Sequence, residues 1–144
     1  MDIIEANIAA TQYTSHPCTS KYGTCDHGGC PVNAKNYGLG PGYRGIDSTR
    51  PYTVTTTFRT DTGTDSGTVT SIEQVLTQGN STIRLPAINQ GYCSGGPDPQ
   101  YYASGGLPAL STSFKRGMTM VFSLWGGGGN SMSWLGKLYL LSSS

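Results

Sequence analysis

The sequence predicts an all-β protein with the architecture of a β-sandwich or jelly roll. Only 12% of its 144 residues are charged, glycine occurs 21 times, and threonine is frequent whereas lysine, glutamate and leucine are scarce. This composition is typical of strands joined by many turns. Two segments alternate apolar and polar side chains with a period of two, as strands with one packed face do. Because such a sheet needs a second sheet to cover it, we expect two layers in one domain.

The first half of the chain is predicted to begin and end with a strand. Residues Asp2 to Ala10 are read as a strand, and Thr11 to Gly45 as a long loop rich in glycine, proline and cysteine. The clearest strand is predicted for Pro51 to Thr60, where four side chains on one face alternate with Thr53, Thr55, Thr57 and Arg59 on the other. The four are Tyr52, Val54, Thr56 and Phe58.

The second half is expected to continue as an antiparallel meander. Thr68 to Gln78 follows a turn-rich stretch and is predicted to pair with the preceding strand, and Ser81 to Leu85 follows Gly79-Asn80 as the next strand. Gln90 to Gly106 is read as a loop, and no helix is predicted. The remaining expectations are a strand over Gly117 to Trp125, a last strand over Ser131 to Leu141, and a disordered tail at 142–144.

Charge and cysteine content narrow the classes of partner and compartment. A net charge of +1 with no basic run argues against nucleic acid and anionic membrane surfaces as partners, and no stretch has the apolar length of a membrane span. Four cysteines in a small polar chain favour disulfides and an oxidising compartment. Asn80-Ser81-Thr82 is an acceptor pattern for glycosylation, which agrees with secretion, although Met1-Asp2 does not begin a signal peptide.

Metal binding is the alternative use of the cysteines. Cys18, Cys25, His27 and Cys30 include zinc-ligand types, but their spacing fits no standard zinc pattern. We therefore predict no metal and no cofactor.

Asp2 and Glu5 are the candidates for acid–base chemistry. Two residues three positions apart on a regular strand face opposite sides, so both line one cleft only if a β-bulge lies between them. Taken alone, the pattern is weak and favours two solvated acids on an edge strand. The motif around it is more informative.

Asp2-Ile3-Ile4-Glu5-Ala6-Asn7 resembles the signature Glu-Met-Asp-Ile-Trp-Glu-Ala-Asn of glycoside hydrolase family 7, the fungal cellulases, with Ile4 in place of the tryptophan. Further matches follow in the family's order along nearly the whole chain. They are Tyr13-Thr14-Ser15-His16-Pro17-Cys18, Cys25-Asp26-His27-Gly28-Gly29-Cys30, Tyr37-Gly38, Pro41-Gly42, residues 47–54, residues 61–67, Gly91-Tyr92-Cys93, residues 120–125 and residues 132–135.

The resemblance implies an incomplete concanavalin-like sandwich, a partial catalytic domain over residues 1–144, and hydrolysis of β-1,4-glucosidic bonds in cellulose with retention of configuration. It implies that Glu5 is the acid/base, Asp2 the assisting carboxylate and His16 a supporting residue. The family's nucleophilic glutamate would stand two positions before Asp2. We therefore expect the sequence as it stands, a fragment or truncated form, to lack the family's route to a covalent intermediate.

The same resemblance assigns substrate contacts and disulfides. Trp125 and Trp134 match tryptophans of the sugar-binding subsites, where an indole face stacks on a pyranose ring, although burial in the sandwich would explain either ring. Tyr37 and Lys21 are weaker candidates. The implied disulfides are Cys18 to Cys25 and Cys30 to Cys93, among three pairings that the sequence alone allows.

Three hypotheses follow for the function. The first is an endoglucanase-like enzyme, secreted and monomeric, acting on cellulose or another β-1,4-glucan. The second is a non-catalytic remnant or glucan-binding sandwich. The third is a small secreted lectin or inhibitor stapled by its cysteines, which would fold cooperatively by itself.

Overall fold

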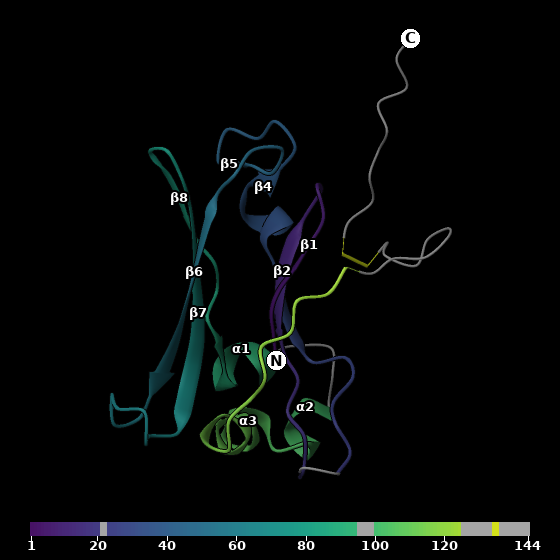
Figure 1. Ribbon diagram of the computed structural model, residues 1–144, viewed down its shortest axis with the longest axis vertical. Coiled ribbons are helices and arrows are strands. Elements are labelled where there is room, and N and C mark those ends of the chain that lie inside the picture. The colour runs from purple at the N-terminus through teal and green to yellow at the C-terminus, as the bar shows by residue number, and fades with distance from the viewer. Residues whose placement is uncertain (21–22, 95–99, 125–133, 136–144) are drawn as a thin grey trace.

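The computed structural model describes residues 1–20, 23–94, 100–124 and 134–135. Figure 1 shows two β-sheets side by side, with helices across one end. The site sheet contains β1 (Asp2–Ala6), β2 (Thr11–Ser15) and β3 (Cys30–Asn33), in that order. The long sheet contains β6 (Thr53–Thr60), β7 (Val69–Gln78) and β8 (Ser81–Arg84), and β9 (Ile88–Asn89) pairs with β7. All these pairings are antiparallel.

The two sheets face each other across one apolar core. Tyr13 and Val32 of the site sheet belong to the same buried cluster as Ile72 and Leu76 of the long sheet. The Tyr13 hydroxyl also crosses the layer and donates a hydrogen bond to the Pro86 carbonyl at 2.5 Å. The predicted two-layer all-β architecture is therefore confirmed.

The long sheet matches the prediction closely. Its buried side chains on β7 recur at Ile72, Gln74 and Leu76, which places every second residue in the core. On β6, Phe58 packs edge-on against Phe114, with the ring centroids 5.1 Å apart. The three predicted strands of the meander are confirmed, with their ends shifted by one or two residues.

The prediction of a loop from Thr11 to Gly45 is wrong. That range contains β2, β3, the 3₁₀ helix η1 (Ala34–Tyr37) and β4 (Leu39–Gly40), which pairs in parallel with β5 (Ile46–Asp47). All five residues of β2 are buried, so no exposed face produces the alternation by which a strand is recognised. The predicted strand from Asp2 to Ala10 ends at Ala6, because the Asn7 side chain accepts hydrogen bonds from two backbone N–H groups and turns the chain into β2.

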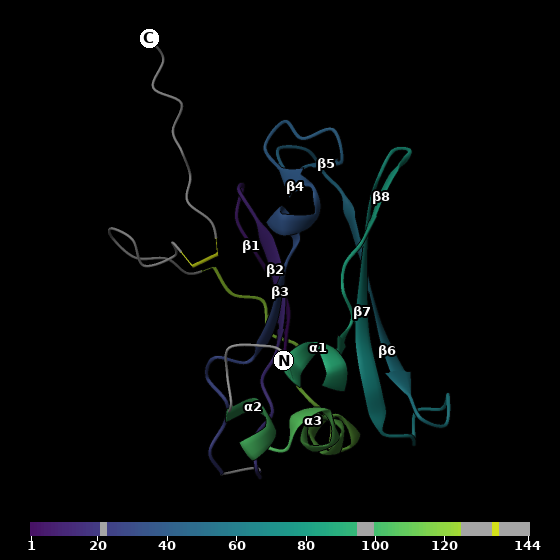
Figure 2. The ribbon, with the colours of Figure 1, turned by 180° about the vertical axis from the view of Figure 1, so that it is seen from behind.

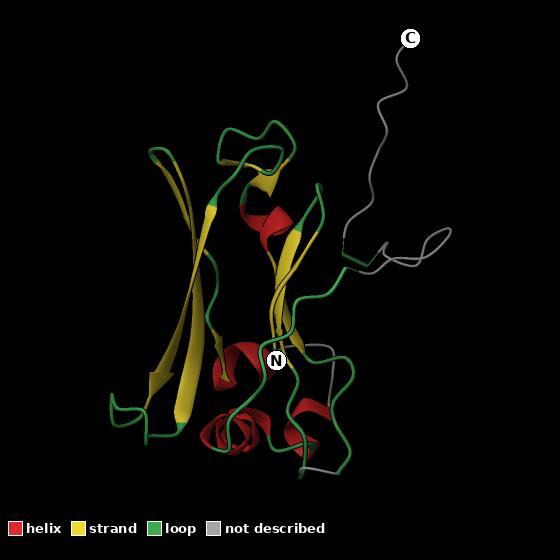
Figure 3. Ribbon diagram, viewed as in Figure 1, coloured by secondary structure: helices red, strands yellow, loops and turns green. Residues whose placement is uncertain are grey.

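The prediction of no helix is also wrong. Helices α1 (Gln90–Ser94) and α2 (Gln100–Ala103) lie within the predicted loop from Gln90 to Gly106, and α3 (Gly106–Lys115) begins at its last residue. All three lie toward the lower end of the molecule in Figures 2 and 3. The buried residues of α3 include Leu107 and Leu110, spaced as one helical face requires. Pro108 is tolerated because it lies in the first turn.

The predicted strand over Gly117 to Trp125 is wrong over residues 117–124, which form no strand. Phe122 is 90% exposed and Leu124 is fully exposed. Their alternation has no partner strand in the described part of the chain, and a strand requires a hydrogen-bonded ladder. Of the predicted strand over Ser131 to Leu141, only Trp134 and Leu135 are described, and they form a turn. The tail at 142–144 lies outside the described residues.

Candidate active site

A β-bulge brings Asp2 and Glu5 to the same face of the site sheet. Asp2 is opposite Thr14 and Glu5 is opposite Gln12, so three steps along β1 match two steps along β2. This extra residue restores the parity that a regular strand would break. Glu5 then reaches the Thr14 hydroxyl, which donates to its Oε2 at 3.3 Å, and Asp2 reaches His16. The bulge that the sequence reading required is present.

His16 lies between two acceptors. Its Nε2 is 2.9 Å from Asp2 Oδ2, and its Nδ1 is 2.9 Å from the Asp26 backbone carbonyl oxygen. A carbonyl oxygen and a carboxylate can only accept, so both ring nitrogens are best satisfied as donors. This arrangement favours the imidazolium form. The hydrogen bond to Asp2 raises the pKa of His16 above its ordinary value, against the opposing effect of burial.

The two carboxyl groups have pKa values shifted in opposite directions. The hydrogen bond from His16 lowers the pKa of Asp2 below its ordinary value, although partial burial opposes it. Burial raises the pKa of Glu5, and the negative charge of Asp2 raises it further. Two neighbouring acids whose environments separate them in this way can divide the roles of proton donor and charged partner. Glu5 is the group suited to donate a proton.

A short loop between two disulfides holds His16 in place. The Asp26 carboxylate is buried, and its Oδ1 accepts from the N–H groups of Gly28 and Gly29, each at 3.1 Å. Gly29 has φ of 69°, and a Cβ there would lie 2.7 Å from the ring of His16. Only glycine therefore permits this approach. Sequence reasoning did not identify Asp26 as part of the site, since its contribution depends on the fold of the loop.

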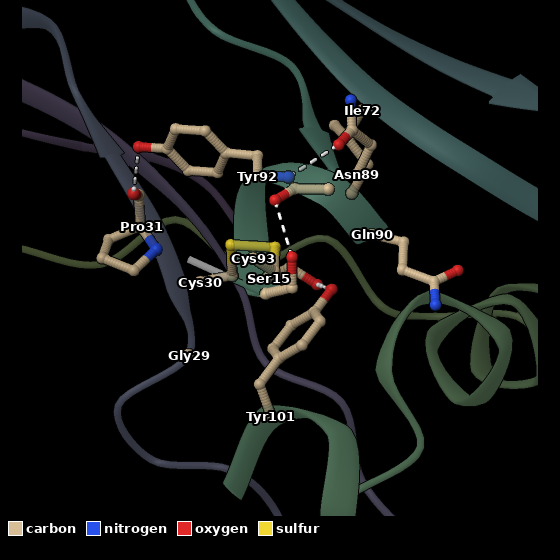
Figure 4. The surroundings of a disulfide bond; sticks show 12 residues. Ser15, Gly29, Cys30, Pro31, Ile72, Asn89, Gln90, Tyr92, Cys93 and Tyr101 are labelled. Atoms are coloured by element: carbon tan, nitrogen blue, oxygen red, sulfur yellow. Dashed lines mark hydrogen bonds between the residues drawn. A yellow bond between two sulfur atoms is a disulfide. The ribbon is translucent and has the colours of Figure 1, made fainter. Parts of the chain in front are cut away.

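Both disulfides implied by the family resemblance are present. Cys18–Cys25 closes the loop beside His16, and Cys30–Cys93 joins β3 to α1. Figure 4 shows the surroundings of the second, where the hydroxyls of Ser15 and Tyr101 lie 3.2 Å apart beneath it. The start of β3 is thus tied to the helical end of the molecule.

The predicted substrate contacts are only partly within the described residues. Trp134 is 43% exposed, and the neighbouring Leu135 is buried, with its carbonyl accepting from Asn33 Nδ2 at 2.9 Å. Tyr37 is 41% exposed at the end of η1. Lys21 and Trp125 lie outside the described residues.

Asn80 is exposed in the turn between β7 and β8, where its glycosylation stays a prediction. Within the described residues, no group of three metal-ligating side chains forms.

Comparison with known proteins identifies one family over the whole chain. The sequence model described as "Glycosyl hydrolase family 7" matches residues 1–144. The chain is 35% identical to a probable endo-β-1,4-glucanase celB of Aspergillus terreus, an alignment that covers 94% of this chain and 38% of the relative. It is also 35% identical to endoglucanase EG-1 of Trichoderma longibrachiatum, covering 94% of this chain and 29% of the relative. The chain thus spans about a third of the length of these curated relatives.

Solved structures give the same picture of the fold. A double mutant of the endocellulase EGI of Humicola insolens superposes with a TM-score of 0.78 and 25% identity, over 94% of this chain and 40% of that one. A family 7 cellobiohydrolase of Daphnia pulex superposes with a TM-score of 0.71 and 23% identity, over 79% and 35%. None of the helices in the described part of the chain is long and apolar enough to cross a membrane.

Proposed function

The chain belongs to glycosyl hydrolase family 7, and we propose that it hydrolyses β-1,4-glucosidic bonds in cellulose or a related β-glucan with retention of configuration. The observation that carries the proposal is the pair of carboxyl groups on one face of β1, with the pKa of Asp2 lowered and that of Glu5 raised. Both curated relatives reported above are named endoglucanases, which favours cleavage within the glucan chain.

In the proposed reaction, Glu5 acts twice on the substrate. It first gives its proton to the glycosidic oxygen as the bond to the sugar breaks, and a carboxylate nucleophile takes the sugar as an ester. Ionised Glu5 then removes a proton from a water molecule, whose oxygen displaces that carboxylate and restores the configuration. In the family signature that the sequence resembles, the nucleophilic glutamate stands two positions before the counterpart of Asp2.

Asp2 and His16 serve the reaction through charge and position. The ion pair keeps Asp2 ionised, and the Asp2 charge in turn raises the pKa of Glu5 so that it retains its proton for the first step. A neutral residue at position 2 would make Glu5 a stronger acid that is less often protonated. The exposed rings of Trp134 and Tyr37 are proposed to bind sugar, as are Lys21 and Trp125.

Several further properties belong to the same proposal. Two disulfides and the relationship to fungal endoglucanases support secretion into an oxidising compartment. The substrate is proposed to be bound by a monomer, without nucleic acid or membrane as partners.

The test is hydrolysis of carboxymethyl cellulose by the purified chain, set beside its Glu5→Gln variant. Release of reducing ends by the parent chain that falls at least about 100-fold in the variant would support the proposal, because a general acid contributes rate factors of this size. Thr55→Ala, on the exposed face of β6, is the matched control and should retain full activity. Equal background rates in parent chain and Glu5→Gln would reject hydrolysis by this chain.

A second candidate function is glucan binding without hydrolysis. It is favoured by the exposed Trp134 ring. Affinity electrophoresis in a gel containing hydroxyethyl cellulose separates the candidates. Retardation that is lost in Trp134→Ala, together with no hydrolysis, would establish the binding function, whereas hydrolysis sensitive to Glu5→Gln would establish the enzyme.

A further inference from the structure

A row of polar side chains crosses the site sheet and ends at Glu5. Asn33 Nδ2 on β3 donates to Gln12 Oε1 on β2 at 3.3 Å, and Gln12 Nε2 donates to Thr14 Oγ1 at 3.2 Å. Thr14 in turn donates its hydroxyl proton to Glu5 Oε2 at 3.3 Å. The row therefore links all three strands of the sheet to one carboxyl group.

The direction of every hydrogen bond in this row is fixed from its far end. The Lys35 backbone N–H can only donate, and it lies 3.1 Å from Asn33 Oδ1; the Leu135 carbonyl can only accept, and it lies 2.9 Å from Asn33 Nδ2. Asn33 must therefore present its N–H₂ group to Gln12. Gln12 then accepts with its oxygen and donates with its nitrogen, which leaves the single Thr14 proton for Glu5.

Burial of this row destabilises the folded state unless each polar group in it has a hydrogen-bond partner. Gln12 and Thr14 are both buried, and a buried amide that lacks hydrogen bonds would destabilise the folded state. With its partners present, Gln12 uses both its oxygen and its nitrogen. Aligned hydrogen bonds polarise one another, so each donor in the row strengthens the next toward the carboxylate.

We infer that Gln12 is a positioning residue for Glu5, anchored by Asn33, and that the row stabilises the ionised form of Glu5. The inference rests on the proposed function, in which Glu5 must be protonated in one step and ionised in the next. Asp2 opposes ionisation of Glu5, whereas His16 and the donors Thr14 and Gln12 favour it. The row thus allows Glu5 to release its proton, which the charge of Asp2 and partial burial would otherwise hold on the carboxyl group.

The parent chain itself provides the first test. A titration followed by NMR would monitor the Glu5 side-chain carboxyl carbon and the side-chain amides of Gln12 and Asn33. We expect both amides to shift with the same midpoint as Glu5, because the polarisation of the row changes when its terminal acceptor gains a proton. The Gln78 amide, which bonds Asp47 and the loop after it in the long sheet, should not follow that midpoint. Amides of Gln12 and Asn33 that ignore the Glu5 midpoint would overturn the inference.

The second test replaces Gln12 by methionine, which has a similar length and no donor. Gln12→Met is expected to raise the pKa of Glu5 by roughly half a pH unit, the size that loss of one ordinary hydrogen bond implies. Gln78→Met removes an amide of the same kind far from Glu5 and should leave the pKa of Glu5 as in the parent chain. An unchanged Glu5 midpoint in folded Gln12→Met would overturn the inference, and if that variant does not fold, the titration of the parent chain decides.

These measurements do not require turnover. Absence of hydrolysis with the coupled titration intact would reject the proposed function only, whereas hydrolysis without the coupling would reject the role of Gln12 only.

Discussion

The two sheets of this molecule obtain their structure in different ways. In the long sheet, β6 and β7 pair over eight residues as a local hairpin, and β7 buries Ile72 and Leu76 on one face. In the site sheet, β2 is entirely buried, although threonine, glutamine and serine make up four of its five residues. The long sheet is therefore stabilised mainly by apolar burial and neighbouring sequence, whereas the site sheet depends on partners that come from distant segments.

Those partners can be named for each polar residue of β2. Thr11 bonds the Tyr52 hydroxyl, and Ser15 bonds the Tyr101 hydroxyl on α2. Gln12 and Thr14 belong to the row that ends at Glu5. A strand of this kind is stable only when the rest of the fold is in place, which places the site in the part of the molecule most sensitive to tertiary contacts.

Of the changes considered, removing the Cys30–Cys93 disulfide should lower the unfolding free energy most. The bond joins β3 to the helix that follows β9, and its cysteines are 63 residues apart in the sequence. The double variant Cys30→Ser/Cys93→Ser is expected to lose about 4 kcal/mol of unfolding free energy, as constraint of a loop of this length predicts. Urea denaturation followed by tryptophan fluorescence measures the loss. The matched variant Cys18→Ser/Cys25→Ser opens a much shorter loop and should lose about 2 kcal/mol of unfolding free energy. Equal losses in the two variants would contradict the larger stabilisation assigned to Cys30–Cys93.

The next largest effect is expected from the apolar core of the long sheet. Leu76 has no exposed surface, so Leu76→Ala should lower the unfolding free energy by about 3 kcal/mol through lost burial and the cavity that remains. The same denaturation experiment measures the change. Thr55→Ala, on the exposed face of β6, should differ from the parent chain by less than about 0.5 kcal/mol. A small loss in Leu76→Ala would mean that the long sheet does not depend on apolar burial as described.

The same difference explains which parts of the fold the sequence predicts. The strands β6, β7 and β8 alternate along the chain and are joined by short turns, so local pattern is sufficient to find them. Local pattern does not reveal β2, which has two buried faces and no alternation. It does not reveal α3 either, because that helix begins at Gly106 with Pro108 in its first turn. Residues 118–124 show the reverse case, because they alternate clearly but form no strand.

The candidate site is predictable to a similar extent. Asp2, Glu5 and His16 are found from their motif, and parity along β1 is enough to require the bulge. Gln12 and Asp26 are not found, because a glutamine on an unrecognised strand and an aspartate in a loop acquire their roles only from residues that folding brings together. The spacing and periodicity of residues along the sequence contain no information about those contacts.

A Gln74 variant tests whether the hydrogen bond between the two sheets at Ile3 stabilises the bulge. Its Nε2 donates to the Ile3 carbonyl at 2.6 Å, between Asp2 and Glu5, and to Thr56 Oγ1 at 3.1 Å. Gln74→Met should cost about 1 kcal/mol, because the Ile3 carbonyl loses its donor while the burial of the polar Gln74 amide is also relieved. Hydrogen exchange of the β1 amides should accelerate beyond what this global loss explains.

The control for this variant is Thr56→Val, which removes the other acceptor of Gln74 and leaves Ile3 untouched. It should leave exchange in β1 as in the parent chain once global stability is taken into account. If Gln74→Met exchanges its β1 amides at the parent rate, the bulge is held by β2 alone and the cross-sheet bond contributes nothing to it.

The smallest expected effect is the dependence of stability on pH from the pair of Asp2 and His16. The pKa of His16 is raised above 6.5 in the folded state, so its contribution is complete below 6.5 and is lost as the pH rises through the folded value. The pKa of Asp2 is lowered below 3.8, so its contribution is complete above 3.8 and is lost as the pH falls through the folded value. The pair therefore stabilises most between these limits. Glu5, with its pKa raised, has the opposite effect from Asp2 as the pH rises above 4.5.

Because Asp2 is partly exposed to solvent, the contribution of the pair should remain below about 1 kcal/mol. His16→Asn is expected to reduce the unfolding free energy near pH 5.5 and to differ least from the parent chain at pH values well above the folded pKa of His16, where the imidazole is neutral in both states. Urea midpoints measured across this range give the difference curve. His27→Asn, which replaces an exposed histidine of the same loop, is the control for the substitution itself. A His16→Asn difference that stays constant with pH would show that the imidazole acts by packing against Gly29 and not by its charge.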